Sequence, residues 1–90
     1  MSPSILVYHL KPNNSTRFIT CEANLGPFKI KIVKDQDGGK KPYEGWIYIF
    51  NRMLTKEYGE QFISLEACKS FHYNLLMEYL KQCQGLKSYL

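Results

Sequence analysis

The sequence predicts an α+β protein, in which a curved antiparallel sheet of about four strands precedes one long C-terminal helix packed on one face. Two observations carry this prediction. The first part of the chain holds short runs rich in β-branched and aromatic residues, each bounded by turn residues. From Leu65 onward, apolar residues recur instead at steps of three and four, which is the period of a helix.

The first two strand runs end at clusters of Pro, Asn and Gly. Residues 4–10 form a short aliphatic run that stops at the turn around Pro12. Residues 16–23 alternate weakly and end before Gly26. Both runs therefore predict strands that belong to one meander.

The clearest strand pattern covers Phe28–Val33, where large apolar residues alternate with Lys29 and Lys31. After a polar loop, residues 46–50 alternate in the same way. Their aromatic set is Trp46, Tyr48 and Phe50, and their aliphatic set is Ile47 and Ile49. Residues 51–61 stay ambiguous between a helical turn and a long excursion, and residues 61–65 could form a last short strand.

The final element is an amphipathic helix of about 20 residues, or more than five turns. Ser64 is suited to the N-cap, Glu66 and Lys81 complement the macrodipole at the two ends, and Gly85 is the expected stop. The predicted apolar stripe consists of Leu65, Cys68, Phe71, Leu75, Leu76, Tyr79, Leu80 and Cys83. The apolar tail at residues 86–90 is expected to dock on this chain or on a second copy.

Composition predicts one folded domain over residues 1–90. The chain is 44% hydrophobic, which argues against disorder. No apolar run approaches the roughly 20 residues of a membrane span, and no secretory leader is recognised, so no membrane association is expected. The three cysteines are odd in number and widely spaced, which favours a reducing compartment. We therefore expect an intracellular protein, cytoplasmic or nuclear, or one that a virus makes inside a cell.

The net charge of +4 is unevenly distributed along the chain. Residues 1–43 hold seven Lys and Arg against three Asp and Glu, whereas residues 44–90 hold five of each. Five of the cations lie between Lys29 and Lys41. Such asymmetry indicates a polyanionic partner, although lysines that protect a sheet edge from aggregation would give the same pattern.

Catalytic and metal-binding patterns are missing from the sequence. His9 and His72 are the only histidines, and His72 is expected to be a satisfied histidine at the boundary of the helix stripe. Cysteine and histidine spacings give no metal motif. Gly38-Gly39 with two following lysines lacks the full phosphate-loop pattern. The chain is therefore expected to be neither an enzyme nor a cofactor-binding protein.

One surface does resemble a binding site. If strands 28–33 and 46–50 are neighbours, the aromatic face of the second strand lies beside the lysine face of the first. Aromatic platforms stack unpaired bases, while lysines hold the phosphates. The predicted nucleic-acid-binding residues are Arg17, Lys29, Lys31, Lys34, Lys40, Lys41, Trp46, Tyr48 and Phe50. Two other interpretations stay open, namely that these aromatics form the core or that they form a homodimer interface.

Residues 17–32 resemble the first hairpin of purine-rich-element-binding (PUR) repeats. There an arginine–aromatic strand turns at an Asn-x-Gly, as at Asn24-Leu25-Gly26, and returns as a basic, β-branched strand. Residues 62–65 and the following helix are similar to the last strand and helix of that repeat. They are also similar to the Whirly-like single-strand-binding proteins, which include the transcriptional positive cofactor family. The resemblance implies single-stranded DNA or RNA as partner, contacts from Arg17, Lys29 and Lys31, and a homodimer paired through its helices.

Two functional hypotheses follow from these patterns. The first is a non-enzymatic, single-stranded nucleic-acid-binding module that uses the aromatic and lysine-rich sheet face. The alternative is a small virus- or phage-encoded protein-interaction module that docks on a host or viral protein. In that case the same aromatics would anchor a protein interface.

Overall fold

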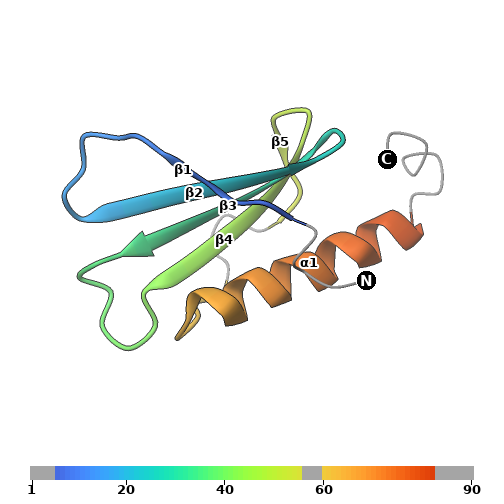
Figure 1. The fold of residues 1–90 in the computed structure, drawn as a ribbon. Coiled ribbons are helices and arrows are strands. Elements are labelled where there is room, and N and C mark those ends of the chain that lie inside the picture. Colours follow the sequence, from blue (N-terminus) through green and yellow to red (C-terminus); the bar gives the residue numbers. More distant parts are fainter. Residues whose placement is uncertain (1–5, 56–59, 83–90) are drawn as a thin grey trace.

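The computed structural model describes residues 6–55 and 60–82. It contains a five-stranded antiparallel sheet in the order β1-β2-β3-β4-β5, followed by one helix (Figure 1). The elements are β1 (His9–Lys11), β2 (Phe18–Leu25), β3 (Phe28–Asp35), β4 (Tyr43–Ile49), β5 (Arg52–Met53) and α1 (Leu65–Gln82). The predicted α+β class, antiparallel sheet and C-terminal helix are confirmed.

The edges of the sheet differ from the prediction. Among the described residues of the first apolar run, strand pairing begins only at His9, and Leu6 is buried in the core instead. The ambiguous region contains the short strand β5, which the sequence did not reveal. The expected strand at 61–65 is reduced to a single bridge between Phe62 and Tyr43, after which the chain enters α1.

Helix α1 begins where the capping residues predict. The backbone N–H of Ala67 donates to the Ser64 hydroxyl at 3.1 Å, so one of the unpaired N–H groups of the first turn is satisfied. Glu66 lies in the first turn and Lys81 in the last. The predicted stop at Gly85, the stripe residue Cys83 and the tail at 86–90 lie outside the described residues.

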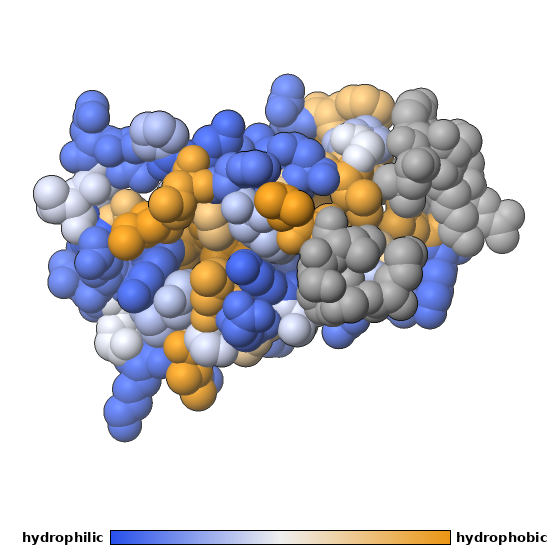
Figure 2. Space-filling view, in the orientation of Figure 1, coloured by the Kyte–Doolittle hydropathy of each residue, from blue (hydrophilic) through white to orange (hydrophobic). Residues whose placement is uncertain are grey.

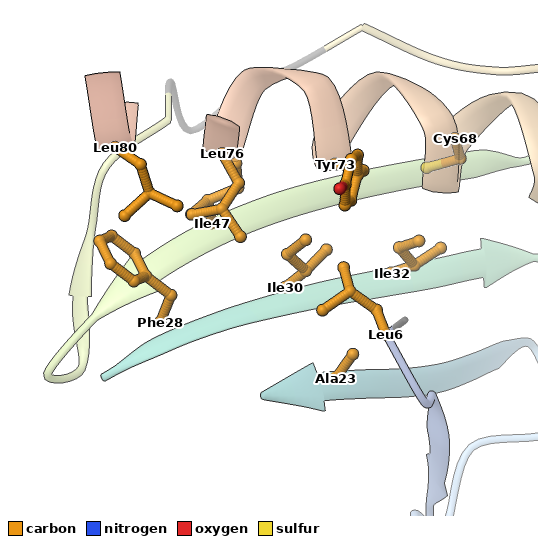
Figure 3. Packing of buried hydrophobic residues seen from close by; sticks show 10 residues of the cluster. All are labelled: Leu6, Ala23, Phe28, Ile30, Ile32, Ile47, Cys68, Tyr73, Leu76 and Leu80. Carbon is orange, nitrogen blue, oxygen red and sulfur yellow. The ribbon is translucent and has the colours of Figure 1, made fainter. Parts of the chain in front are cut away.

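The core lies between α1 and the β3–β4 pair (Figure 3). Period-two alternation points Phe28, Ile30 and Ile32 toward the helix, and Ile47 joins them from β4 with no exposed surface. The helix contributes Cys68, Tyr73, Leu76 and Leu80, while Leu6 and Ala23 extend the cluster toward β2. This face of the sheet, called the inner face below, is the one that the isoleucine pattern predicted.

The buried side of α1 is rotated relative to the predicted stripe. Phe71 was expected in the core but keeps 38% of its surface exposed, whereas His72 is only 3% exposed. The His72 ring packs directly on Gly45 of β4, where a Cβ would lie 2.5 Å from its Cε1 atom. Its Nδ1–H donates to the Cys68 carbonyl at 2.7 Å, which fixes the tautomer. His72 is therefore satisfied, as predicted, but buried rather than at the boundary.

The helix leaves part of the inner face uncovered. It packs on β3 and β4, while Leu10 and Ile19 toward the other edge stay 75% and 42% exposed. Beside them lies an apolar groove of about 130 Å³, which is also lined by Cys21, Tyr43 and Leu65. Figure 2 shows patches of hydrophobic residues between hydrophilic residues on the face it presents.

Gly45→Ala should destabilise the fold by about 1–3 kcal/mol, because the new methyl group collides with the His72 ring and forces α1 away from β4. Urea denaturation of the variant would measure this loss. In a His72→Ala background the same substitution should cost less than half as much, since the ring is gone. Equal losses of unfolding free energy in both backgrounds would show that the contact between His72 and Gly45 does not determine the position of α1 on the sheet.

Candidate nucleic-acid interface

The outer face of the sheet, which lies opposite α1, carries two lysine–aromatic pairs. Register places Lys31 directly across from Trp46 and Lys29 directly across from Tyr48. Both pairs alternate with the buried Ile30–Ile47 pair, so they point away from the helix. The prediction that β3 and β4 are neighbours, with the isoleucines under the helix and this indole outside the core, is confirmed.

Lys29 is held in place by two partners. Its Nζ lies 5.3 Å from the centroid of the Tyr48 ring and 3.7 Å from a Glu22 carboxylate oxygen. Glu22 also pairs with Lys11 at 3.5 Å, and its side chain is only 12% exposed. Burial, with a smaller contribution from Glu22, raises the pKa of the Tyr48 hydroxyl, which stays protonated at neutral pH. A carboxylate is thus built into the middle of the proposed basic surface.

Arg17 is also committed to carboxylates. Its Nε donates to Asp35 Oδ1 at 2.8 Å and its Nη2 donates to Oδ2 at 3.1 Å, while Asp37 lies 3.8 Å away. The guanidinium carbon is 5.2 Å from the centroid of the Phe18 ring. This bidentate ion pair links the N-terminal end of β2 to the C-terminal end of β3.

The other predicted cations fall into two groups. Lys31, Lys40 and Lys41 form no ion pair within the described part of the chain. Lys34 was assigned to the loop but lies in β3, where it pairs across from Tyr43 and Ile19 on the inner face. Its Nζ is 5.6 Å from the Tyr43 ring centroid and it lines the apolar groove there. Lys34 therefore lies on the opposite face of the sheet from Lys31.

Phe50 does not share the strand face of Trp46 and Tyr48. It follows the end of β4, in the tight turn to β5, and has a φ of 46°. Asn51 beside it has a φ of 68°, and positive φ at both central residues is the geometry of a type I′ hairpin turn. An aromatic residue is strained in this conformation, and Phe50 stays 65% exposed. Such retained strain at an exposed aromatic is typical of a contact site.

A hollow of about 100 Å³ opens on the outer face where β3 ends and β4 begins. Its lining comprises Phe18, Val33, Asp35, Gly38, Lys41, Pro42, Glu44, Trp46 and Gln61. One wall is the β3–β4 loop, where Gly38 approaches so tightly that a Cβ would lie 2.9 Å from the Pro42 Cα. Phe18, Glu44 and Gln61 were missed by sequence reasoning. Glu44 could have been found, because the outer-face alternation that selects Trp46 also selects Glu44. Phe18 reaches the hollow through its register with Asp35, which the sequence alone does not fix.

The described residues offer no other obvious chemistry. No group of three or more His, Cys, Asp or Glu within residues 6–55 and 60–82 could hold a metal ion. Burial raises the pKa of the Cys68 thiol to about 12, so it is inert at neutral pH. In the same part of the chain, no helix combines the length and apolarity that crossing a membrane requires.

No family model, curated protein or solved structure matches this chain. The resemblance to PUR repeats and Whirly-like proteins therefore stays a prediction from residues 17–32 and the helix. The function must be inferred from the geometry of the outer face.

Phe50→Asn should stabilise the protein by about 1 kcal/mol, because Asn tolerates positive φ better than an aromatic residue. The bond from the residue 50 N–H to the Pro27 carbonyl, 3.2 Å long, would be kept. The unfolding midpoint in urea measures the effect. A loss of stability would indicate that the Phe50 ring makes a packing contribution larger than its backbone strain.

The Arg17–Asp35 pair should give a pH-dependent contribution to stability. Hydrogen bonds from Arg17 hold the pKa of the Asp35 carboxyl below its ordinary value. The stabilisation is therefore present at neutral pH and is lost as the pH falls through the lowered pKa. In Arg17→Ala, carboxyl ¹³C NMR should show the Asp35 pKa rising, and the acid limb of the stability profile should flatten. An unchanged Asp35 titration would contradict the pairing.

Proposed function

We propose that this protein is a non-enzymatic module that binds single-stranded nucleic acid on the outer face of its sheet. The observation that carries the proposal is the Lys31–Trp46 cross-strand pair, repeated beside it by Lys29 and Tyr48. Each pair combines a flat ring for a base with an ammonium for a phosphate.

The spacing of the two aromatics favours an extended single strand over a duplex. Trp46 and Tyr48 are two residues apart in a strand, so their Cα atoms are separated by about 6.8 Å. Stacked bases in a duplex rise by only about 3.4 Å each. Consecutive bases can reach both rings only if they are unstacked, which a single strand permits. Base–aromatic stacking contributes roughly 1–3 kcal/mol for each base.

The carboxylates on this face limit how strongly a polyanion is held. Arg17 and Lys29 already have anionic partners at Asp35 and Glu22, and a phosphate would have to displace them. Lys31, Lys40 and Lys41 can bind phosphate without that exchange. Binding through three such contacts predicts a slope of about −2 for log K against log salt concentration on a single strand.

Two further parts of the proposal concern location and assembly. The free thiols of Cys21 and Cys68 support an intracellular location, cytoplasmic or nuclear. A homodimer is supported by Ile63, just before α1, and Phe71, within α1, which expose 70% and 38% of their surface. Sedimentation of the purified chain, with and without an oligonucleotide, would test the dimer.

The protein-interaction alternative is favoured by a different observation. Phe50 and Met53 expose 65% and 39% of their surface around the β4–β5 turn, and Met53 lies directly across from Tyr48. Exposed apolar residues around an aromatic are typical of protein anchors. Under this alternative, removing Lys31 would have little effect on partner capture, while removing Trp46 would abolish it.

The single Trp of the chain makes the test direct, since tryptophan fluorescence, excited selectively over that of tyrosine, reports on Trp46 alone. Titration with a twelve-residue oligothymidine at low salt should quench this fluorescence through base stacking, and added salt should reverse the quenching. Lys31→Glu should weaken binding at least tenfold through loss of a phosphate contact and added repulsion. Fluorescence anisotropy of a labelled oligonucleotide extends the measurement to Trp46→Ala.

Lys81→Glu is the matched control, because it makes the same charge change in the last turn of α1, on the other side of the molecule. It should change affinity far less than Lys31→Glu. Absence of binding at low salt, or equal losses in the two variants, would refute a specific outer-face site.

A further inference from the structure

The hollow where β3 ends and β4 begins has a lining suited to one flat ring. Trp46 and Phe18 contribute aromatic surface, and Val33 and Pro42 contribute apolar surface between them. Trp46 also belongs to the lysine–aromatic surface of the proposed function, so a strand bound there passes the mouth of the hollow. The hollow therefore continues the proposed site and is not a separate cavity.

The size of the hollow favours a single six-membered ring. Its volume is about 100 Å³. A closed cavity of about 150 Å³ is sufficient to bind benzene. An open hollow of this size can hold most of a pyrimidine, while the fused rings of a purine would extend well beyond it. Volume thus favours cytosine, thymine or uracil over adenine and guanine.

The polar groups at the rim distinguish among the pyrimidines. Glu44 is the main acceptor, and its Oε1 is oriented by a 2.9 Å hydrogen bond from Gln61 Nε2. The second carboxylate, Asp35, has both oxygens occupied by Arg17. Lys41 supplies the cation of the lining. The hollow thus presents an accepting carboxylate together with a donating ammonium.

Cytosine is complementary to this arrangement. It carries an amino group at C4, which can donate to a carboxylate, and a carbonyl at C2, which can accept from a lysine. Thymine and uracil carry a carbonyl oxygen at C4 instead, and a base that lies in the same orientation would turn this oxygen toward the Glu44 carboxylate. We propose that the hollow is a cytosine-binding subsite, in which the base lies against Trp46, donates its amino group to Glu44 and accepts from Lys41. This inference rests on the proposed function and adds base preference to it.

The position of Glu44 supports discrimination by this carboxylate. It lies in β4, directly across from Val33, so its backbone is fixed by the sheet ladder. The hydrogen bond from Gln61 restricts the side chain as well. An acceptor held in this way loses little freedom when a base binds, and it cannot turn away readily from a thymine oxygen.

The test uses Trp46 fluorescence to compare twelve-residue oligocytidine, oligothymidine and oligoadenosine deoxynucleotides at pH 7.5 and low salt. Oligocytidine should bind about tenfold more tightly than oligothymidine, as expected for one base-selective contact. Glu44→Gln should bring the two affinities within about threefold of each other, because the neutral amide can donate as well as accept. The amide oxygen can still accept from Gln61, and unfolding in urea would verify that the variant is folded.

Glu66→Gln in the first turn of α1 is the matched control and should keep the tenfold preference. If the wild-type chain binds the oligonucleotides with equal affinity, the cytosine subsite is refuted while the proposed function stands. If a preference for oligocytidine persists undiminished in Glu44→Gln, the assignment of Glu44 is wrong. If no oligonucleotide binds, the proposed function itself fails, and the subsite fails with it.

Discussion

The pairing of Ile30 with Ile47 determines what both faces of this sheet can do. These two side chains are almost completely buried under α1, so their neighbours in each strand must point to the opposite face. A slip of β4 by one residue along β3 would expose Ile47 and place Trp46 beneath the helix. The large free energy of burying aliphatic side chains therefore holds the lysines and aromatics in register on the outer face.

Helix α1 adds a second constraint through His72 and Gly45. A glycine in the middle of a strand weakens the strand, yet here it leaves the space that the imidazole ring fills. The ring is also hydrogen-bonded to the Cys68 carbonyl, so its burial leaves no unsatisfied Nδ1–H. The contact between His72 and Gly45 explains why the helix turns Phe71 outward instead of burying it. The centroid of the Phe71 ring there lies 5.1 Å from that of the Phe62 ring.

Sequence reasoning found the features that depend on local periodicity. The alternation in residues 28–33 and 46–50 and the Ser64 cap gave the sheet faces and the start of α1, because each is encoded within a few residues. It did not find the rotation of α1, since Phe71 and His72 are adjacent on the helix and only the distant Gly45 decides between them. The turn at Phe50 and Asn51 was missed because an aromatic at positive φ has no sequence pattern. The ion pairs of Arg17 and Lys29 depend on strand register, which sequence alone does not fix.

The same register decides the electrostatic character of the outer face. Glu22 of β2 lies directly across from Lys31 of β3 and forms a diagonal ion pair with Lys29. Since Glu22 also pairs with Lys11 of β1, acidic and basic side chains alternate across β1, β2 and β3. A surface with this pattern attracts a polyanion less strongly than the net charge suggests. Under the proposed function, a larger share of the binding energy must therefore come from stacking and base contacts. Selectivity then depends on rings and hydrogen-bonding groups that are already fixed in place. In the proposed site, carboxylates such as Glu44 would act against nonspecific phosphate binding and would at the same time offer acceptors to which a base can donate.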